Sequence, residues 1–240
     1  MRTVIWLLYA VLGLILSLPA LLISVLTQSK EEFARPPKTA LWVVEHIIPT
    51  VVWLGGCRCT VYGRENIPEG AAYYTGNHQG NFDVGLILYA LGGYRIPIAK
   101  YEASKVPLAN LWMKVLRLIF IKRNEPRQSA ECMNKAAGYL EHGVSVVVFP
   151  EGTRSKSRTL GEFKPGAFKP ALKAGVPVVP FVIDGTYKCF EEHKTLKKAE
   201  VTLHILPPVY PEKLGITKTK ELSAYVRQLI EEQLNKNAAE

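Results

Sequence analysis

The sequence predicts an α/β fold in which a mixed, largely parallel β-sheet is flanked by helices and preceded by an N-terminal two-helix membrane hairpin. Two apolar segments open the chain, and short β-rich runs then alternate with helical stretches, a pattern typical of parallel sheets. With 240 residues, 48% of them hydrophobic, the chain can bury one substantial core. We therefore expect a membrane-associated hairpin at residues 1–56 and one α/β domain at residues 57–240.

The first apolar segment, residues 4–26, contains no charged side chain. As one helix with a rise of 1.5 Å per residue it would be about 35 Å long, enough to cross a bilayer. A signal peptide is the alternative, because Arg2 precedes the run. The run is long for the apolar part of a signal peptide, however, and it lacks a convincing cleavage site of small residues.

The second apolar segment, residues 40–54, follows a polar connector at residues 28–38 in which two prolines stop the first helix. It is short for a membrane span and contains polar residues, so it suits the membrane interface better. Trp42 and Trp53 would anchor such a segment at headgroup level, although ordinary packing on the α/β domain explains them nearly as well.

The α/β domain is expected to contain seven strands and five helices. The expected strands are residues 57–62, 71–75, 95–99, 118–122, 144–149, 176–183 and 201–206. The expected helices are residues 83–91, 107–117, 127–142, 166–174 and 218–236. The last helix is amphipathic, and its apolar side contains Leu222, Tyr225, Val226, Leu229, Ile230 and Leu234.

The net charge of +9 indicates a polyanionic partner: a nucleic acid, an anionic bilayer or a phosphorylated substrate. The apolar N-terminus favours the bilayer, so we expect no nucleic-acid partner. The four cysteines include only one close pair, which predicts neither a disulfide framework nor a zinc site of two cysteine pairs. Reduced thiols and no bound metal are the expectation.

His78 and Asp83 lie between the strand at 71–75 and the helix at 83–91. On a regular helix they would be about 140° apart, so they can meet only if His78 lies in the turn and Asp83 in the first helical turn. Gly80 gives the backbone of that turn the conformational freedom it needs. An anionic Asp83, favoured by the helix dipole, would fix the imidazole tautomer and make His78 a general base. The alternative is an ordinary turn with a capping aspartate.

The segment FPEGTRS, residues 149–155, follows the strongly apolar strand at 144–149. Ligands collect at the carboxyl ends of strands in α/β sheets, so this loop should share an edge with His78. Glu151 can accept a hydrogen bond from a substrate hydroxyl, and Gly152 allows close backbone approach. Arg154 offers a planar fork that suits phosphate.

Other cations follow two more strands in the same way: Lys122 and Arg123 after the strand at 118–122, and Lys100 after the strand at 95–99. Cations after three strands, beside a histidine and an aspartate, indicate an anion site. A further basic run after the FPEGTRS loop could face phospholipid headgroups or donor phosphates, or could simply be solvated. It contains Lys156, Arg158, Lys164, Lys169 and Lys173.

Four motifs in order, NHQGNFD, IFIKR, FPEGTRS and VPVVPFVI, resemble those of the glycerolipid acyltransferases with an HxxxxD motif. Within that family they are most similar to the 1-acyl-sn-glycerol-3-phosphate (lysophosphatidic acid) acyltransferases, whose first motif is commonly preceded by a segment like VYGRENIP. The resemblance covers roughly residues 60–183.

The resemblance implies that His78 and Asp83 are the catalytic pair. It also implies that the phosphate-bearing acceptor is bound by Arg123, Glu151, Gly152, Thr153 and Arg154. Lys100 joins this set on its position alone. The motif around Pro180 would contribute to the acyl-donor side or to packing.

The sequence departs from the family at Gly80 and Asn81, where a serine is frequent, and at Arg117 and Lys122, where glycine and aspartate are common. The acceptor is therefore less well specified than the reaction.

The expected reaction transfers a fatty acyl group from acyl-CoA or acyl-ACP to the sn-2 hydroxyl of lysophosphatidic acid, giving phosphatidic acid for phospholipid biosynthesis. No GxSxG elbow is present and no cysteine lies in the motifs, so direct attack is favoured over a covalent acyl-enzyme. The thioester is the only co-substrate expected, and no cofactor is needed. The alternatives are another lysophospholipid or glycerol-3-phosphate as acceptor, a metal-dependent phosphohydrolase, and a non-enzymatic membrane-binding protein.

The expected location is the cell membrane, with the catalytic domain on the cytoplasmic side where thioester donors are found. Lys30, Arg35 and Lys38, next to the apolar segment, agree with the positive-inside rule. Chain-length preference, the choice between CoA and ACP, the depth of the hairpin, the oligomeric state and the oxyanion-stabilising groups are left open by the sequence.

Overall fold

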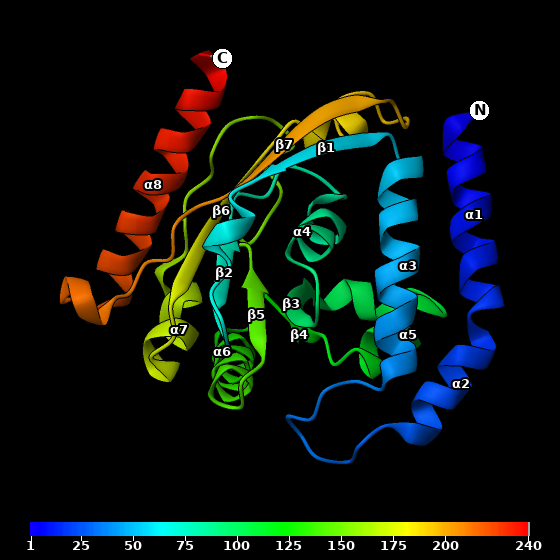
Figure 1. Cartoon of the computed structure of the whole chain (residues 1–240), viewed down its shortest axis with the longest axis horizontal. Coiled ribbons are helices and arrows are strands. Elements are labelled where there is room, and N and C mark those ends of the chain that lie inside the picture. Colours follow the sequence, from blue (N-terminus) through cyan, green and yellow to red (C-terminus); the bar gives the residue numbers. More distant parts are fainter. Residues whose placement is uncertain (240) are drawn as a thin grey trace.

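A seven-stranded sheet lies between two layers of helices in the computed structural model, which describes residues 1–239 (Figure 1). The strands are β1 (Cys57–Tyr62), β2 (Tyr73–Gly76), β3 (Arg95–Lys100), β4 (Ile119–Ile121), β5 (Ser145–Val148), β6 (Val178–Asp184) and β7 (Ala199–Ile205). Their order is β1-β7-β6-β2-β5-β3-β4, and only the β6–β7 pair is antiparallel. The predicted mixed, largely parallel sheet is confirmed.

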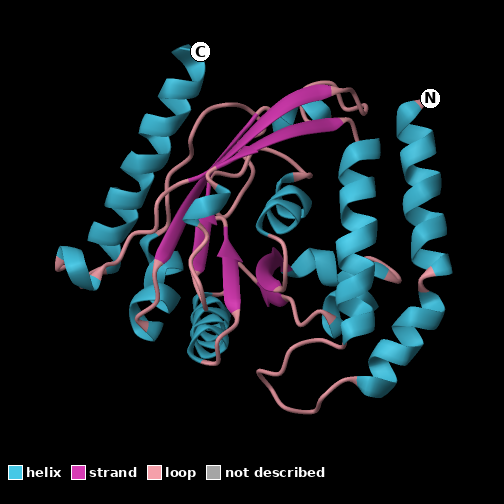
Figure 2. Ribbon diagram, viewed as in Figure 1, coloured by secondary structure: helices cyan, strands magenta, loops and turns pink. Residues whose placement is uncertain are grey.

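Five helices flank the sheet (Figure 2): α4 (Asp83–Leu91), α5 (Ala109–Val115), α6 (Pro126–Glu141), α7 (Lys169–Ala174) and α8 (Thr219–Ala239). The helix predicted at 107–117 is shorter because Leu108 and Arg117 on its flanks both have left-handed backbone. The helix predicted at 166–174 begins as a 3₁₀ turn, Pro165–Phe168. An α-helix there would need an N–H from Pro170 for the carbonyl of Gly166, and proline has none.

Successive residues in the central strands face opposite layers of helices. Tyr73 and Val146 pack with residues of α6, α7 and α8, whereas their neighbours Tyr74 and Val147 pack with residues of α4. All four are fully buried. A sheet buried on both faces explains why its strands are continuous apolar runs instead of alternating ones.

The first apolar segment is not one helix. It forms α1 (Arg2–Leu16) and α2 (Leu18–Thr27), which meet at a bend of 45°. Pro19 cannot donate a hydrogen bond to the preceding turn, so the ladder breaks there. Within residues 1–239, no individual helix has the length and apolarity of a membrane span, whereas the bent pair together has both.

Helix α3 (Lys38–Leu54) is the second apolar segment, and it runs beside α1 and α2 (Figure 1). The indole of Trp6 donates a hydrogen bond of 2.8 Å to the carbonyl of Val51, which joins α1 to α3. The indole of Trp112 in α5 donates one of 3.0 Å to the hydroxyl of Ser17 at the bend. The N-terminal helices are thus fixed to the α/β domain.

Candidate active site

The expected site residues come from loops at the carboxyl ends of four neighbouring strands, in the order β2, β5, β3 and β4. These strands are parallel, so the loops that follow them meet at one edge of the sheet. A cavity of about 860 Å³ opens there. Of the eight residues singled out from the sequence, six line it: His78, Lys100, Arg123, Gly152, Thr153 and Arg154.

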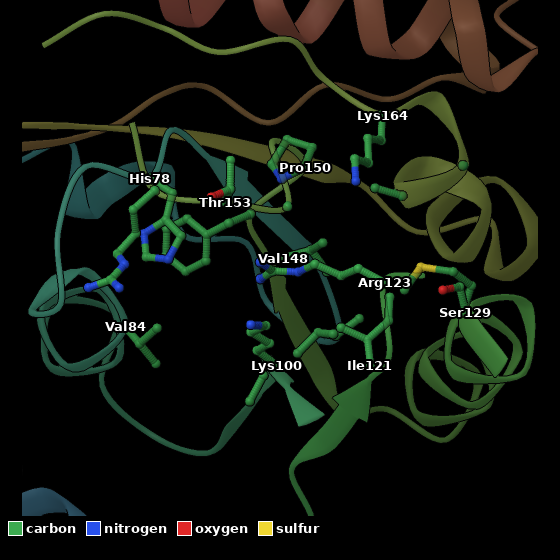
Figure 3. A pocket seen from close by; sticks show the side chains of 18 of the residues that line it. His78, Val84, Lys100, Ile121, Arg123, Ser129, Val148, Pro150, Thr153 and Lys164 are labelled. Atoms are coloured by element: carbon green, nitrogen blue, oxygen red, sulfur yellow. The ribbon is translucent and has the colours of Figure 1, made fainter. Parts of the chain in front are cut away.

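His78 and Asp83 form a hydrogen-bonded pair (Figure 3 shows His78 at one side of the cavity). His78 Nδ1 lies 2.7 Å from Asp83 Oδ2, and His78 is in the turn while Asp83 is the first residue of α4. The His78 side chain is 14% exposed and that of Asp83 is fully buried. With Nδ1 donating to the carboxylate, Nε2 is left as the nitrogen that can accept a proton.

Several groups hold this pair in place. Asp83 Oδ2 also accepts hydrogen bonds from the backbone N–H groups of Gln79, at 2.6 Å, and Gly80, at 2.8 Å. Asp83 Oδ1 accepts one from the hydroxyl of Thr186. The imidazole of His78 stacks on the ring of Phe149 at a centroid distance of 4.3 Å. Such preorganisation is what a general base needs.

Glu151 does not line the cavity; it braces the loops around it. Its Oε1 accepts a hydrogen bond of 2.8 Å from the backbone N–H of His78, and its Oε2 accepts one of 3.1 Å from that of Gly161. Burial raises the pKa of this carboxyl group, against the opposing effect of the two backbone donors. With both oxygens occupied, the geometry favours a positioning role over the substrate contact that the sequence predicted.

Arg154 lies at the cavity wall in a fixed orientation. Its Nη1 donates to the side-chain carbonyl of Asn81 and, at 3.1 Å, to Glu191 Oε1. The same Glu191 oxygen accepts the backbone N–H of Asn81 at 2.8 Å. The Glu191 side chain is only 3% exposed, whereas that of Arg154 is 35% exposed, so the carboxylate is shielded from solvent and the guanidinium remains partly accessible from the cavity.

Arg123 also lines the cavity, but its guanidinium makes no hydrogen bond or ion pair with any residue of the described chain, 1–239. Burial is the main cause that lowers its pKa; nearby Arg154 lowers it further and Glu102 opposes both. An arginine stays cationic at neutral pH even so. Lys100 is 54% exposed and pairs with Glu102 at 3.1 Å, while Lys122 pairs with Glu125 and lies outside the cavity lining.

The lining of the cavity is partly cationic and partly apolar. Its cationic lining residues are Lys100, Arg123, Arg154, Lys156, Lys164 and Lys169, and no aspartate or glutamate among residues 1–239 lines it. The apolar part includes Ile98, Ile121, Met133 and Val148. In the described chain no three His, Cys, Asp or Glu side chains are grouped to hold a metal. A general base, anion-binding groups and an apolar space suit acyl transfer to a phosphorylated lipid.

Sequence reasoning missed Thr186 and Glu191. A signal was available for Thr186, because it closely follows β6, the strand beside β2, and so lies at the same edge of the sheet. Glu191 lies beyond the 3₁₀ turn Thr186–Cys189 and carries no comparable signal. The motif around Pro180 forms β6, where Phe181 lies so close beneath Gly76 that a Cβ there would be 2.3 Å from its ring.

Comparison with known proteins agrees with this geometry. A family model described as "Acyltransferase" matches residues 58–184. A probable 1-acyl-sn-glycerol-3-phosphate acyltransferase of Mycoplasma pneumoniae is 34% identical over 202 residues, which cover 79% of this chain and 76% of that one. The 1-acyl-sn-glycerol-3-phosphate acyltransferase of Haemophilus influenzae is 31% identical over 166 residues, 68% of each chain.

A solved structure is similar over the whole length of the chain. It is the crystal structure of the 1-acyl-sn-glycerophosphate acyltransferase from Thermotoga maritima, which is 28% identical with a TM-score of 0.77. The likeness covers 100% of this chain and 99% of that one. The sequence match, the shared fold and the His78–Asp83 pair agree: this chain belongs to the acyltransferase family.

Proposed function

We propose that this enzyme transfers a fatty acyl group from a thioester, acyl-CoA or acyl-ACP, to the sn-2 hydroxyl of lysophosphatidic acid, giving phosphatidic acid for phospholipid biosynthesis. The observation that carries the proposal is a histidine–aspartate pair at the wall of a cavity to which the described residues contribute six cations and no carboxylate. The relatives named above support the same acceptor.

In the proposed reaction His78 Nε2 removes the proton of the sn-2 hydroxyl as its oxygen attacks the thioester carbonyl carbon. The new C–O bond gives a tetrahedral intermediate, and its collapse breaks the C–S bond. The leaving thiolate takes the proton from His78 or departs unaided. Asp83, anionic in this scheme, stabilises the imidazolium, and general base catalysis of this kind contributes about 10²- to 10⁴-fold in rate.

Arg123 and Arg154 would bind the phosphate of the acceptor. Arg123 makes no hydrogen bond or ion pair within the described chain, so its guanidinium N–H groups are available to an anion, while Arg154 is oriented by Asn81 and Glu191. Gly152 and Thr153 line the cavity next to Arg154, and Lys100 adds a more solvated charge. Holding the phosphate turns a collision of two substrates into an oriented encounter.

We also propose that residues 1–56 attach the enzyme to the cell membrane, with the catalytic domain, residues 57–240, on the cytoplasmic side. Helices α1 and α2 expose many apolar side chains, among them Leu8, Leu12, Leu22 and Leu26. Large exposed apolar patches are uncommon on monomeric soluble proteins and mark surfaces that contact a membrane or another protein.

Two tryptophans of α3 support this attachment. Trp42 and Trp53 are 58% and 57% exposed, as expected of anchors at headgroup level.

The test is the turnover of the purified enzyme in detergent with lysophosphatidic acid and acyl-CoA or acyl-ACP. His78→Ala should lower kcat by about 10²-fold or more because the base is lost. His193→Ala is the matched control, since His193 is 38% exposed and pairs only with Glu192. Substantial turnover by His78→Ala would remove the general-base role. A panel of other lysophospholipids and glycerol-3-phosphate tests the identity of the acceptor. A higher kcat/KM with one of them would contradict the assignment of lysophosphatidic acid as the acceptor.

A further inference from the structure

Three lysines that line the cavity have no hydrogen-bond or ion-pair partner among the described residues. Lys156, Lys164 and Lys169 line the cavity, are exposed, and make no side-chain hydrogen bond or ion pair within residues 1–239. Two other cations of the same basic run differ. Arg158 pairs with Asp184 at 2.9 Å and donates to the carbonyl of Leu234, and Lys173 does not line the cavity. We call Lys164 and Lys169 the lysine rim. Lys156 is left out because it follows Ser155, whose backbone N–H donates to the carbonyl of His78 at 2.8 Å.

The loop that carries Lys164 is tied to the FPEGTRS loop. Lys164 donates its backbone N–H to the carbonyl of Pro150 at 3.0 Å, and Gly161 donates to Glu151 Oε2 at 3.1 Å. The ammonium of Lys164 lies over Gly152: a Cβ built on that glycine would be 3.2 Å from Lys164 Nζ. The position of this lysine is therefore set by the same loop that carries Arg154.

The two proposed substrates carry phosphate at different distances from the reacting atoms. In the acceptor the phosphate is on the carbon next to the one with the reacting hydroxyl, so it must bind close to His78. Arg154 is there, because it bonds to Asn81, three residues after His78. In the donor the phosphates are separated from the thioester by the whole pantetheine arm, so they must bind far from His78.

Lys164 lies at the far side of the cavity from His78, beyond Thr153 and Pro150 (Figure 3). We propose that the lysine rim binds the phosphate groups of the pantetheine thioester donor, leaving Arg123 and Arg154 to the acceptor. The inference rests on the proposed function and extends it to the second substrate. The chemistry is shared by acyl-CoA and by the phosphopantetheine of acyl-ACP.

The test is the double variant Lys164→Gln/Lys169→Gln, with Lys173→Gln, in the same helix α7 as Lys169, as the matched control. KM for acyl-CoA, and separately for acyl-ACP, is measured at saturating lysophosphatidic acid. KM for lysophosphatidic acid is then measured at a saturating concentration of each donor. The double variant should raise the KM of the donor that uses the rim about tenfold, as expected for the loss of two solvated ionic contacts. kcat and the KM for lysophosphatidic acid should stay unchanged, and so should every constant of the control.

Charge restoration and salt provide a second readout. Lys164→Arg/Lys169→Arg should return the donor KM to the wild-type value, and added salt should raise that KM in the wild type more than in the Gln variant, because exposed charges are screened. A rise confined to acyl-CoA would identify its nucleotide phosphates as the ligand. A rise confined to acyl-ACP would identify the carrier.

The proposal is overturned if neither donor KM changes, if the KM for lysophosphatidic acid rises as much as that for the donor, or if Lys173→Gln has the same effect. If the wild-type enzyme acylates lysophosphatidic acid, any of these results leaves the proposed function intact. A wild-type enzyme without that activity contradicts the proposed function instead.

Discussion

Thr186→Val is expected to weaken both the fold and catalysis, because Thr186 is the one described residue that hydrogen-bonds Asp83 Oδ1. Asp83 is fully buried, so its oxygen cannot find water in place of the lost hydroxyl. A hydrogen bond to a charged group contributes about 1.5–3 kcal/mol, and a domain of this size loses about 2–4 °C in Tm per kcal/mol. The expected decrease in Tm is therefore roughly 3–12 °C.

The effect of Thr186→Val on catalysis should be smaller than that of losing His78. Oδ2 keeps its contacts with His78 and with two backbone N–H groups, so the imidazole stays in place while the carboxylate loses one of its anchors. A tenfold loss in kcat, which corresponds to about 1.4 kcal/mol, is the upper bound that we expect.

The assay is thermal unfolding in detergent together with kcat at saturating substrates. Thr186→Ser is the control because it keeps the hydroxyl and removes one buried methyl group, at a cost of about 1 kcal/mol. If Thr186→Val unfolds at the wild-type temperature, or if Thr186→Ser loses as much stability and activity as Thr186→Val, the hydroxyl does not support Asp83 and the reasoning fails.

Arg154→Ala should raise KM for lysophosphatidic acid more than KM for the thioester, and Glu191→Gln, which keeps an oxygen for the backbone N–H of Asn81 but loses the charge, should do the same. Because the Glu191 charge acts on Arg154, the double variant Arg154→Ala/Glu191→Gln should be no worse than Arg154→Ala, whereas additive effects would contradict the coupling. Iodoacetamide at about pH 8 should leave activity unchanged, because little of either thiol is ionised at that pH. Burial raises the pKa of Cys59 to about 12, and a hydrogen bond with Cys189 together with burial raises the pKa of Cys57; rapid inactivation would contradict this. Gly152→Ala should lower the free energy of unfolding by about 1–2 kcal/mol, because Gly152 has a φ of +68°, and an unchanged denaturation curve would show that the loop adapts.

Much of the sheet and the position of the site were predictable because both follow from simple patterns. Strands such as β5 and β6 are short apolar runs, and parallel strands bring their carboxyl ends to one edge, which placed His78, Arg123 and Arg154 around one cavity. The bend between α1 and α2 was missed because the apolar pattern continues unchanged through Pro19.

The sequence names a side chain but does not give the direction in which it points. Glu151 was expected to face substrate, yet its carboxylate turns toward the backbone of His78 and Gly161. Thr186 and Glu191 contact residues about a hundred positions earlier in the chain, and no local pattern encodes such pairs. These partners depend on how the loops after β2 and β6 pack.

Phe82 connects the packing of the N-terminal helices to the candidate active site. Its ring meets that of Trp6 edge to face at a centroid distance of 6.0 Å, and a Cβ on Gly55, just after α3, would be 2.3 Å from it. The next residue is Asp83. A shortened enzyme that starts at β1 would therefore lose the packing beside Asp83 as well as the exposed apolar surface of α1 and α2, and its kinetics would not report those of the intact chain.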